Sequence, residues 1–387
     1  MAMLTPAQKP RGLARRIFIG VSHSGRGPAA IGYNGLGRDR IVVQAAKRGQ
    51  TGRLPGLPAT AQGSGCMQVG TPHSVPSPQH GQAAVRDPVA WRLAELPAGT
   101  DLAAAEAFCR AVARRHYENF TVATRLVPPR LRQHLANVYA FARWADDLGD
   151  ESASSAEAGA ALAAWREELD ACFADRPRHP VLVALAATIR EAGLDRQPFA
   201  DLIDAFEQDQ KQTRYATRDE LQGYCHRSAD PVGRIVLALE GCRDPRLVSM
   251  SDSICTGLQL VNFWQDIRRD RLAGRVYLPL DDMTRHGVDE AMLDAPSASP
   301  ALRRLVADEV EWARRCFAEG APLAAAAPAV LQPAIEMFIG GGRAVADAIE
   351  RAGFDTLARR PTVGRWAKTR LAARAWWRSR VAGGGRA

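Results

Sequence analysis

The chain has 387 residues, of which 46% are hydrophobic, and its formal net charge is +9. This length and composition allow a large buried core. The charge does not point to nucleic acid, because residues 1–88 hold 11 Lys and Arg against two acidic residues and account for all of it. Residues 89–387 are therefore neutral overall, and we expect no nucleic-acid partner.

The cysteine pattern and the hydropathy indicate in which cellular compartment the protein is expected. Seven cysteines are scattered without a Cys-x-x-Cys pair, which is typical of a reducing compartment rather than of disulfides or a zinc site. No stretch approaches the roughly 18 uninterrupted apolar residues of a membrane-spanning helix. We expect a cytoplasmic protein, with peripheral contact at the inner face of the cytoplasmic membrane as an option.

Residues 1–88 differ in texture from the rest of the chain. They contain 14 of the 33 glycines and 9 of the 24 prolines, and they show no sustained helical or strand periodicity. Such a segment cannot bury enough apolar surface to offset the entropy of ordering. We predict a disordered basic extension here, either a targeting leader or sequence that is not part of the natural protein. Residues 89–387 then form one domain.

From Asp101 onward, apolar residues recur at three- and four-residue spacing in long Ala/Leu/Arg/Glu segments, which predicts packed amphipathic helices and an all-α fold. Proline and glycine separate most of these segments. The predicted helices span residues 101–118, 130–147, 155–174, 180–192, 198–210, 217–227, 231–240, 246–268, 300–318, 328–352 and 365–380.

A polar stripe interrupts the otherwise apolar helix at 130–147. At about 100° per residue, Tyr139, Arg143, Asp146 and Asp150 fall within about 60° of one another and share one helical face. Taken alone, such a stripe is more often a solvated helix face than a site. Its tyrosine and arginine are suited to donate hydrogen bonds to phosphate oxygens.

A second acidic stripe of matching length follows on the helix at 246–268 and beyond. Gln259, Asn262, Asp266 and Asp270 lie within about 80° on one face. If the two stripes face one another, their carboxylates repel unless a cation lies between them. Ligands that are all oxygen favour Mg²⁺, which usually binds carboxylates together with substrate phosphate. The predicted metal ligands are Asp146, Asp150, Asn262, Asp266 and Asp270.

With these two stripes the chain resembles the squalene/phytoene synthase family, whose members carry two aspartate-rich helices around a central cavity. The first stripe matches the family's Asp-x-x-x-Asp with its upstream phosphate contacts. The second matches Gln-x-x-Asn-x-x-x-Asp-x-x-x-Asp, and residues 274–279 look like the flap, where Arg275 and Tyr277 would help to close the site. The resemblance implies the isoprenoid synthase fold, with Asp146, Asp150, Asp266 and Asp270 as catalytic residues.

Two stretches depart from the family pattern. Where many relatives have Ser-x-Ser-Phe, this chain has Asn119 and Phe120 near the start of the match, and both are predicted to contact substrate. The stretch resembling Tyr-x-Val-Ala-Gly-x-Val-Gly runs from Cys225 to Gly233. It lacks the tyrosine of the reductive members, and Tyr224, His226 or Arg227 are possible substitutes.

These features are similar to the hydroxysqualene synthases of bacterial hopanoid pathways. The resemblance implies ionisation of presqualene diphosphate and capture of the cation by water, without NADPH, between apolar walls such as Phe120, Phe141 and Phe263. One alternative is head-to-head condensation of two molecules of a prenyl diphosphate such as farnesyl diphosphate, of the presqualene, squalene or phytoene type. Another is a non-catalytic relative that acts as an assembly scaffold.

The end of the chain carries the last predicted feature. Residues 356–387 hold nine basic residues and no acidic one, and tryptophans lie among them at 366, 376 and 377. A basic helix with indole side chains suits docking on an anionic bilayer. Ordinary packing with a basic rim is the equal alternative.

Overall fold

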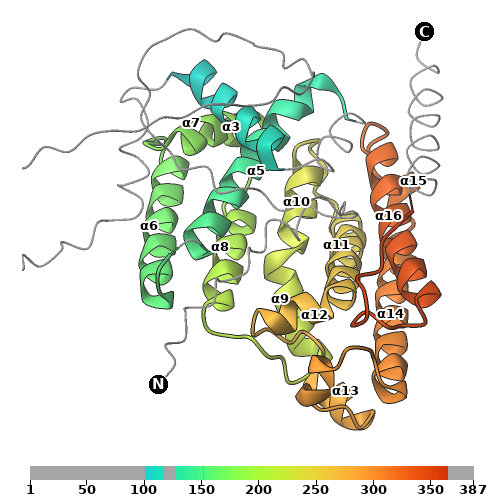
Figure 1. The fold of residues 1–387 in the computed structure, drawn as a ribbon. Coiled ribbons are helices and arrows are strands. Elements are labelled where there is room, and N and C mark those ends of the chain that lie inside the picture. Colours follow the sequence, from blue (N-terminus) through green and yellow to red (C-terminus); the bar gives the residue numbers. More distant parts are fainter. Residues whose placement is uncertain (1–100, 117–126, 151, 365–387) are drawn as a thin grey trace, which may run out of the picture. The chain divides into compact units, whose positions relative to one another are not determined.

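The computed structural model describes residues 101–116, 127–150 and 152–364 (Figure 1). Within these ranges every regular element is helical, which confirms the all-α prediction. The predicted extension at 1–88 and the predicted helix at 365–380 lie outside the described residues, as do Asn119 and Phe120.

The elements follow one another as a series of helices with short connections. They are α3 (Leu102–His116), α5 (Pro129–Asp150), α6 (Ser155–Phe173), α7 (Pro180–Ala192), α8 (Gln197–Asp209), α9 (Arg218–Ser228), α10 (Asp230–Ala238), α11 (Pro245–Gln265), α12 (Ile267–Leu272), α13 (Leu280–Arg285), the 3₁₀ helix η1 (Glu290–Asp294), α14 (Pro300–Gly320), α15 (Leu323–Ala326) and α16 (Gln332–Arg351).

Local sequence signals set most of these boundaries. The side chains of Ser154, Thr217 and Ser299 cap the first turns of α6, α9 and α14 by accepting from backbone N–H groups. Gly193 ends α7 in the left-handed conformation, with φ at 60°, which glycine adopts without strain. Capping residues of this kind can be recognised in the sequence as helix boundaries.

Two helices form the centres of the packing. α5 contacts α3, α6, α7 and α8, whereas α11 contacts α9, α10, α14 and α16. α8 joins the two groups, since it packs against α5 and α6 as well as against α9 and α10. Both acidic stripes therefore lie on helices that are surrounded by others, which is an unusual place for carboxylates.

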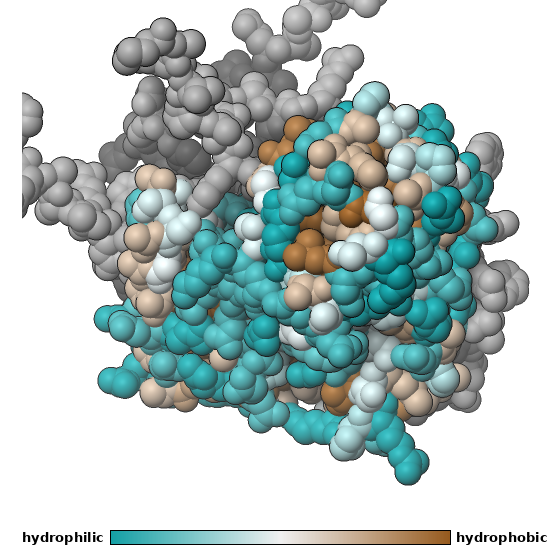
Figure 2. Space-filling model, turned by 90° about the horizontal axis from the view of Figure 1, so that it is seen from below, coloured by the Kyte–Doolittle hydropathy of each residue, from teal (hydrophilic) through white to brown (hydrophobic). Residues whose placement is uncertain are grey.

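Among the described helices, none is long and apolar enough to cross a membrane. The face drawn in Figure 2 is mostly hydrophilic, with small hydrophobic areas between polar ones.

Candidate active site

The first acidic stripe is turned inward. Tyr139 and Asp146 are each 1% exposed, Arg143 is 8% exposed, and Asp150 is partly buried at the end of α5. The Arg143 guanidinium lies between two carboxylates: its Nη1 donates to Asp146 over 2.9 Å and its Nη2 donates to Asp147. Its buried Nε–H has no hydrogen-bond partner among the described residues. The helix therefore carries a fixed guanidinium whose Nε–H is available to donate to a ligand.

Burial opposes the charge of Arg143, yet its pKa is raised because Asp147 and Asp146 lie beside the guanidinium. The arginine therefore stays charged in a largely dry environment. A fixed buried cation of this kind is suited to an anionic ligand.

The second stripe is buried as well. Gln259, Asn262 and Asp270 are 1%, 3% and 2% exposed, and Asp266 is 7% exposed. α11 ends at Gln265 and α12 begins at Ile267, so the expected continuous helix breaks at Asp266. The hydrogen bonds nevertheless continue, from Asp266 N–H to the Asn262 carbonyl at 3.0 Å and from Asp270 N–H to the Asp266 carbonyl at 2.9 Å. The polar residues therefore remain on one side.

Asp266 is held by an arginine that the sequence motifs do not include. Arg360, after α16, donates from Nε and Nη2 to the two oxygens of Asp266 over 2.6 and 3.0 Å. Arg269 is a further partner at 3.3 Å. Arg360 also donates to Gln265 over 2.5 Å. The sequence shows Arg360 only as one basic residue among many, because its partner lies 94 positions away.

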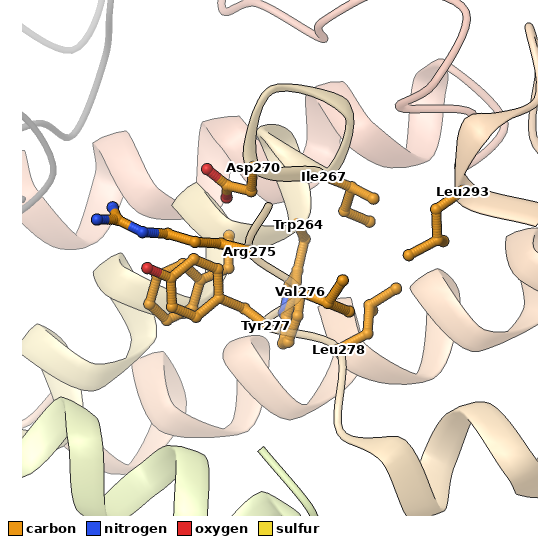
Figure 3. Close-up of a pocket in the computed structure, with 9 residues that line it drawn as sticks. Trp264, Ile267, Asp270, Arg275, Val276, Tyr277, Leu278 and Leu293 are labelled. Carbon is orange, nitrogen blue, oxygen red and sulfur yellow. The ribbon is translucent and has the colours of Figure 1, made fainter. Parts of the chain in front are cut away.

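Arg275 connects the two stripes. Its backbone N–H donates to the Asp270 carbonyl over 2.8 Å, and its side chain lines a small pocket together with Asp270. Figure 3 shows these two polar side chains at one end of the pocket and Leu293 at the other. Burial opposes the charge of Arg275, but its pKa is raised by Asp209 first and also by Asp150. Asp150 on α5 and Asp270 on α12 thus both lie in the neighbourhood of one guanidinium.

Aromatic rings continue the site beyond Arg275. Tyr277 is 5% exposed and stacks on Phe263, with ring centroids 3.9 Å apart and planes 8° from parallel. Tyr224 lies beside both rings, and its hydroxyl donates to Asp209 over 2.8 Å. Phe141, by contrast, packs against Trp165 and Phe199. It lies in the core between α5, α6 and α8, so its prediction as a wall of the site is wrong.

The flap segment is tied down at both ends. Val276 and Leu280 donate from their N–H groups to the carbonyls of Thr213 and Tyr215, over 2.9 and 3.0 Å. At its base, Glu290 receives Arg214 and Arg271, and Arg214 also donates to the Gly274 carbonyl over 2.6 Å. Arg275 and Tyr277 are therefore held by a closed network rather than by a loose loop.

The donor chemistry of both stripes fits a hard cation. The predicted ligands offer only carboxylate and amide oxygens, which suit Mg²⁺. Within the described ranges no three His, Cys, Asp or Glu side chains converge closely enough to hold a metal. The carboxylates of Asp146 and Asp266 are instead compensated by Arg143 and Arg360. The side chain of Gln259 is buried, and neither its amide nitrogen nor its amide oxygen has a partner among the described residues. The site therefore has a hydrogen-bond donor and an acceptor available for a ligand. The metal and catalytic roles stay predictions.

The fold and the site define an all-helical protein in which two acidic helix faces are buried around arginines. The family model described as "Squalene/phytoene synthase" matches residues 113–367. The chain belongs to the squalene/phytoene synthase family.

Relatives and solved structures agree with this assignment. The chain is 32% identical over 290 residues to a phytoene synthase of Arthrospira platensis, which covers 70% of this chain and 93% of the relative. It is 40% identical to the squalene synthase HpnC of Alicyclobacillus acidocaldarius, with a TM-score of 0.64 over 68% of this chain and 98% of that one. A dehydrosqualene synthase, 24% identical, shares the fold with a TM-score of 0.66 over 72% of this chain and 98% of its own.

Proposed function

We propose that this chain is a hydroxysqualene synthase, which converts presqualene diphosphate and water to hydroxysqualene and diphosphate without NADPH. The observation that carries the proposal is the burial of both acidic faces, with one aspartate from each face, Asp150 and Asp270, close to the Arg275 guanidinium. The 40% identity to a squalene synthase over 98% of its length favours a squalene-type reaction. Hopanoid biosynthesis is the pathway in which such an activity belongs.

The metal that the family resemblance implies is Mg²⁺. Asp146, Asp150, Asn262, Asp266 and Asp270 would hold it, and its chemistry would be to stabilise the negative charge that develops on a departing diphosphate.

The chain's own arginines bind and orient the diphosphate. Arg143 offers the unpaired Nε–H, and its charge is fixed by Asp146 and Asp147. Arg275 lines a pocket of the flap together with Asp270. Arginine donors placed before the reaction stabilise the leaving group without reorganisation. Tyr139 lies on the same face of α5, and Gln259 and Asn262 contribute amide groups from α11.

Aromatic side chains shield the cation that ionisation leaves behind. The stacked rings of Phe263 and Tyr277 are buried and have no strongly nucleophilic atom on their faces. Ring faces stabilise positive charge, and burial keeps bulk water away.

Substitution of the aspartates tests the proposal. Asp146→Ala and Asp266→Asn should each lower the release of diphosphate from presqualene diphosphate at least about 100-fold, because charge stabilisation of the leaving group is lost. Diphosphate is measured enzymatically, and hydroxysqualene is identified by mass, without NADPH. Asp204→Asn is the matched control, since Asp204 is partly exposed and pairs with Arg166. Full activity in both site variants would contradict the assignment, provided that circular dichroism shows an intact helical fold.

The second candidate is a head-to-head synthase that condenses two prenyl diphosphates. The identity of 32% to a phytoene synthase over 93% of its length favours it. Separate incubations with farnesyl diphosphate and presqualene diphosphate, followed by mass analysis of the products, distinguish the two reactions. Diphosphate release that depends on Mg²⁺ in either incubation would exclude the scaffold alternative.

We also propose peripheral membrane contact through the residues after Gly364. Equal binding to anionic liposomes by the full chain and by a chain that ends at Gly364 would contradict it.

A further inference from the structure

Within the part of the chain that the structure describes, two buried polar side chains beside the aromatic rings have no hydrogen-bond partner. Ser228, at the end of α9, is 0% exposed, and its hydroxyl is unpaired. Gln259, on α11, is 1% exposed, and both atoms of its amide are unpaired. Each such group costs about 1–3 kcal/mol if it stays unpaired in a dry environment. Two of them on neighbouring helices therefore call for an explanation.

Contacts on either side place the two residues level with each other. Tyr224 on α9 lies beside Phe263 on α11, with ring centroids 6.3 Å apart. Further along, Thr256 on α11 donates to Asp230 at the start of α10 over 2.9 Å. Ser228 lies four residues after Tyr224, and Gln259 lies four residues before Phe263. Because α9 and α11 run in opposite directions between these two contacts, one helical turn from Tyr224 along α9 and one turn back from Phe263 along α11 bring Ser228 opposite Gln259.

Aromatic rings lie on one side of this pair, and the hydrogen bond between Thr256 and Asp230 lies on the other. Tyr224 and Phe263 lie one turn away, and the hydroxyl of Tyr224 is directed to Asp209. A water molecule is retained in such a place when it has two to four polar partners. A hydroxyl and an amide on facing helices supply at least two.

We propose that Ser228 and Gln259 hold the water molecule that captures the carbocation. This inference rests on the proposed hydroxysqualene synthase activity and deepens it, because it assigns the source of the product's hydroxyl group. The amide oxygen of Gln259 accepts a hydrogen bond from one O–H of the water, and the hydroxyl oxygen of Ser228 accepts one from the other O–H. One lone pair of the water oxygen then faces the substrate.

The step balances without a further reagent. Ionisation breaks the C–O bond to diphosphate, and the bonding electron pair leaves with the diphosphate. A lone pair of the held water forms the new C–O bond to the cationic carbon. The oxygen then loses a proton, and the released diphosphate, which is a base, takes it up. The products are one alcohol and one protonated diphosphate.

The ratio of alcohol to hydrocarbon among the products tests this assignment. Presqualene diphosphate and Mg²⁺ are supplied in ¹⁸O-enriched water, and the labelled alcohol is compared with hydrocarbons formed by proton loss. Ser228→Val removes the hydroxyl and has the same shape as Ser228→Thr, so the ratio should fall about tenfold. Gln259→Met should lower the ratio in the same direction. Ser228→Thr, which keeps a hydroxyl, should restore alcohol formation, and Ser253→Ala on the outer side of α11 is the control.

The outcomes separate this inference from the proposed function. A wild-type chain that forms no alcohol from presqualene diphosphate contradicts the proposed function, and this assignment falls with it. A wild-type chain that forms alcohol, together with an unchanged ratio in both Ser228→Val and Gln259→Met, contradicts only the water site. If Ser228→Val does not fold, Ser228→Ala takes its place with the same expectation. A merely structural role of Ser228 would lower the amount of folded enzyme but would leave the product ratio unchanged.

Discussion

Asp209 brings a carboxylate from a third helix, α8, to the candidate site. It is 8% exposed and accepts the hydroxyl hydrogen of Tyr224 over 2.8 Å. Burial first, and then the charge of Asp209, raise the pKa of Tyr224, so this phenol stays neutral. The same carboxylate is the main charge that keeps Arg275 protonated. Asp209 thus anchors both a ring of the aromatic wall and the arginine of the flap.

A double-mutant cycle measures the strength of this anchor. Asp209→Asn and Tyr224→Phe should each destabilise the protein, and their effects should be coupled by about 1–2 kcal/mol, because a hydrogen bond to a buried charged group is lost only once. The free energy of unfolding in urea is the readout. Tyr215→Phe serves as the control, since the buried hydroxyl of Tyr215 has no hydrogen-bond partner. Additive effects of Asp209→Asn and Tyr224→Phe would contradict the contact.

The residues that the sequence reveals are those that follow a helical period. Asp146 and Asp270 stand out because each repeats with other polar residues along one face. Asp209 and Arg360 belong to no such repeat, and each acquires its role from a partner that is remote in the sequence. Only the packing of α8 and of the segment after α16 brings these partners together, which a single sequence does not encode in any local pattern.

At the scale of elements, long helices with capping residues and proline boundaries were predictable, and α7 matches its predicted range of 180–192 in full. Short helices were not. α13, η1 and α15 have six residues or fewer, too short to show a period of 3.6 residues. The break at Asp266 was also missed, because α11 and α12 continue the same apolar spacing through it.

Three elements meet at a buried charged corner near the second stripe. Arg218, the first residue of α9, pairs with Asp282 of α13 over 2.8 Å and with Glu309 of α14 over 3.0 Å. Both carboxylates are 0% exposed. The backbone carbonyl of Glu309 accepts from the indole of Trp264, two residues before Asp266. Asp282 is also paired with Arg285, whereas Glu309 has Arg218 as its cation. Burial raises the pKa of Glu309 to about 8 against the opposing effect of Arg218.

This raised pKa predicts how stability depends on pH. Between the ordinary carboxyl pKa of 4.5 and about 8, the folded chain keeps a proton on Glu309 that the unfolded chain releases. The stability from this group is therefore complete below pH 4.5 and is lost as the pH rises to about 8. Relative to Glu309→Gln, the wild type should lose about 2–3 kcal/mol of unfolding free energy between pH 5.5 and 8.5. A difference between the two proteins that does not vary with pH would contradict an acid that stays protonated.

At the scale of the whole molecule, the organisation depends on how closely helices approach α11. α11 packs against α14 and α16 where glycines remove side chains from the contact. A Cβ on Gly342 of α16 would lie 3.0 Å from Leu258 of α11 and 2.2 Å from the ring of Phe317 on α14. A Cβ on Gly320 would lie 2.4 Å from Ile254 and 2.7 Å from the carbonyl oxygen of Met250. Apart from the one to Leu258, these distances are shorter than any real carbon contact, so the helices that carry the second stripe are fixed in position by their neighbours.

Substitution by alanine should have opposite effects on stability at Gly320 and at Gly223. Gly320→Ala should destabilise the protein by about 1–3 kcal/mol, because the added methyl meets backbone that cannot move aside as a side chain can. Gly223→Ala, on α9, meets nothing within 4 Å, so it should raise stability by about 0.5–1 kcal/mol through higher helix propensity. Urea unfolding of the two variants measures both effects. If Gly320→Ala were as stable as Gly223→Ala, the close approach of α14 to α11 would be refuted. The position of Asp266 and Asp270 relative to the rest of the site would then lose its structural support.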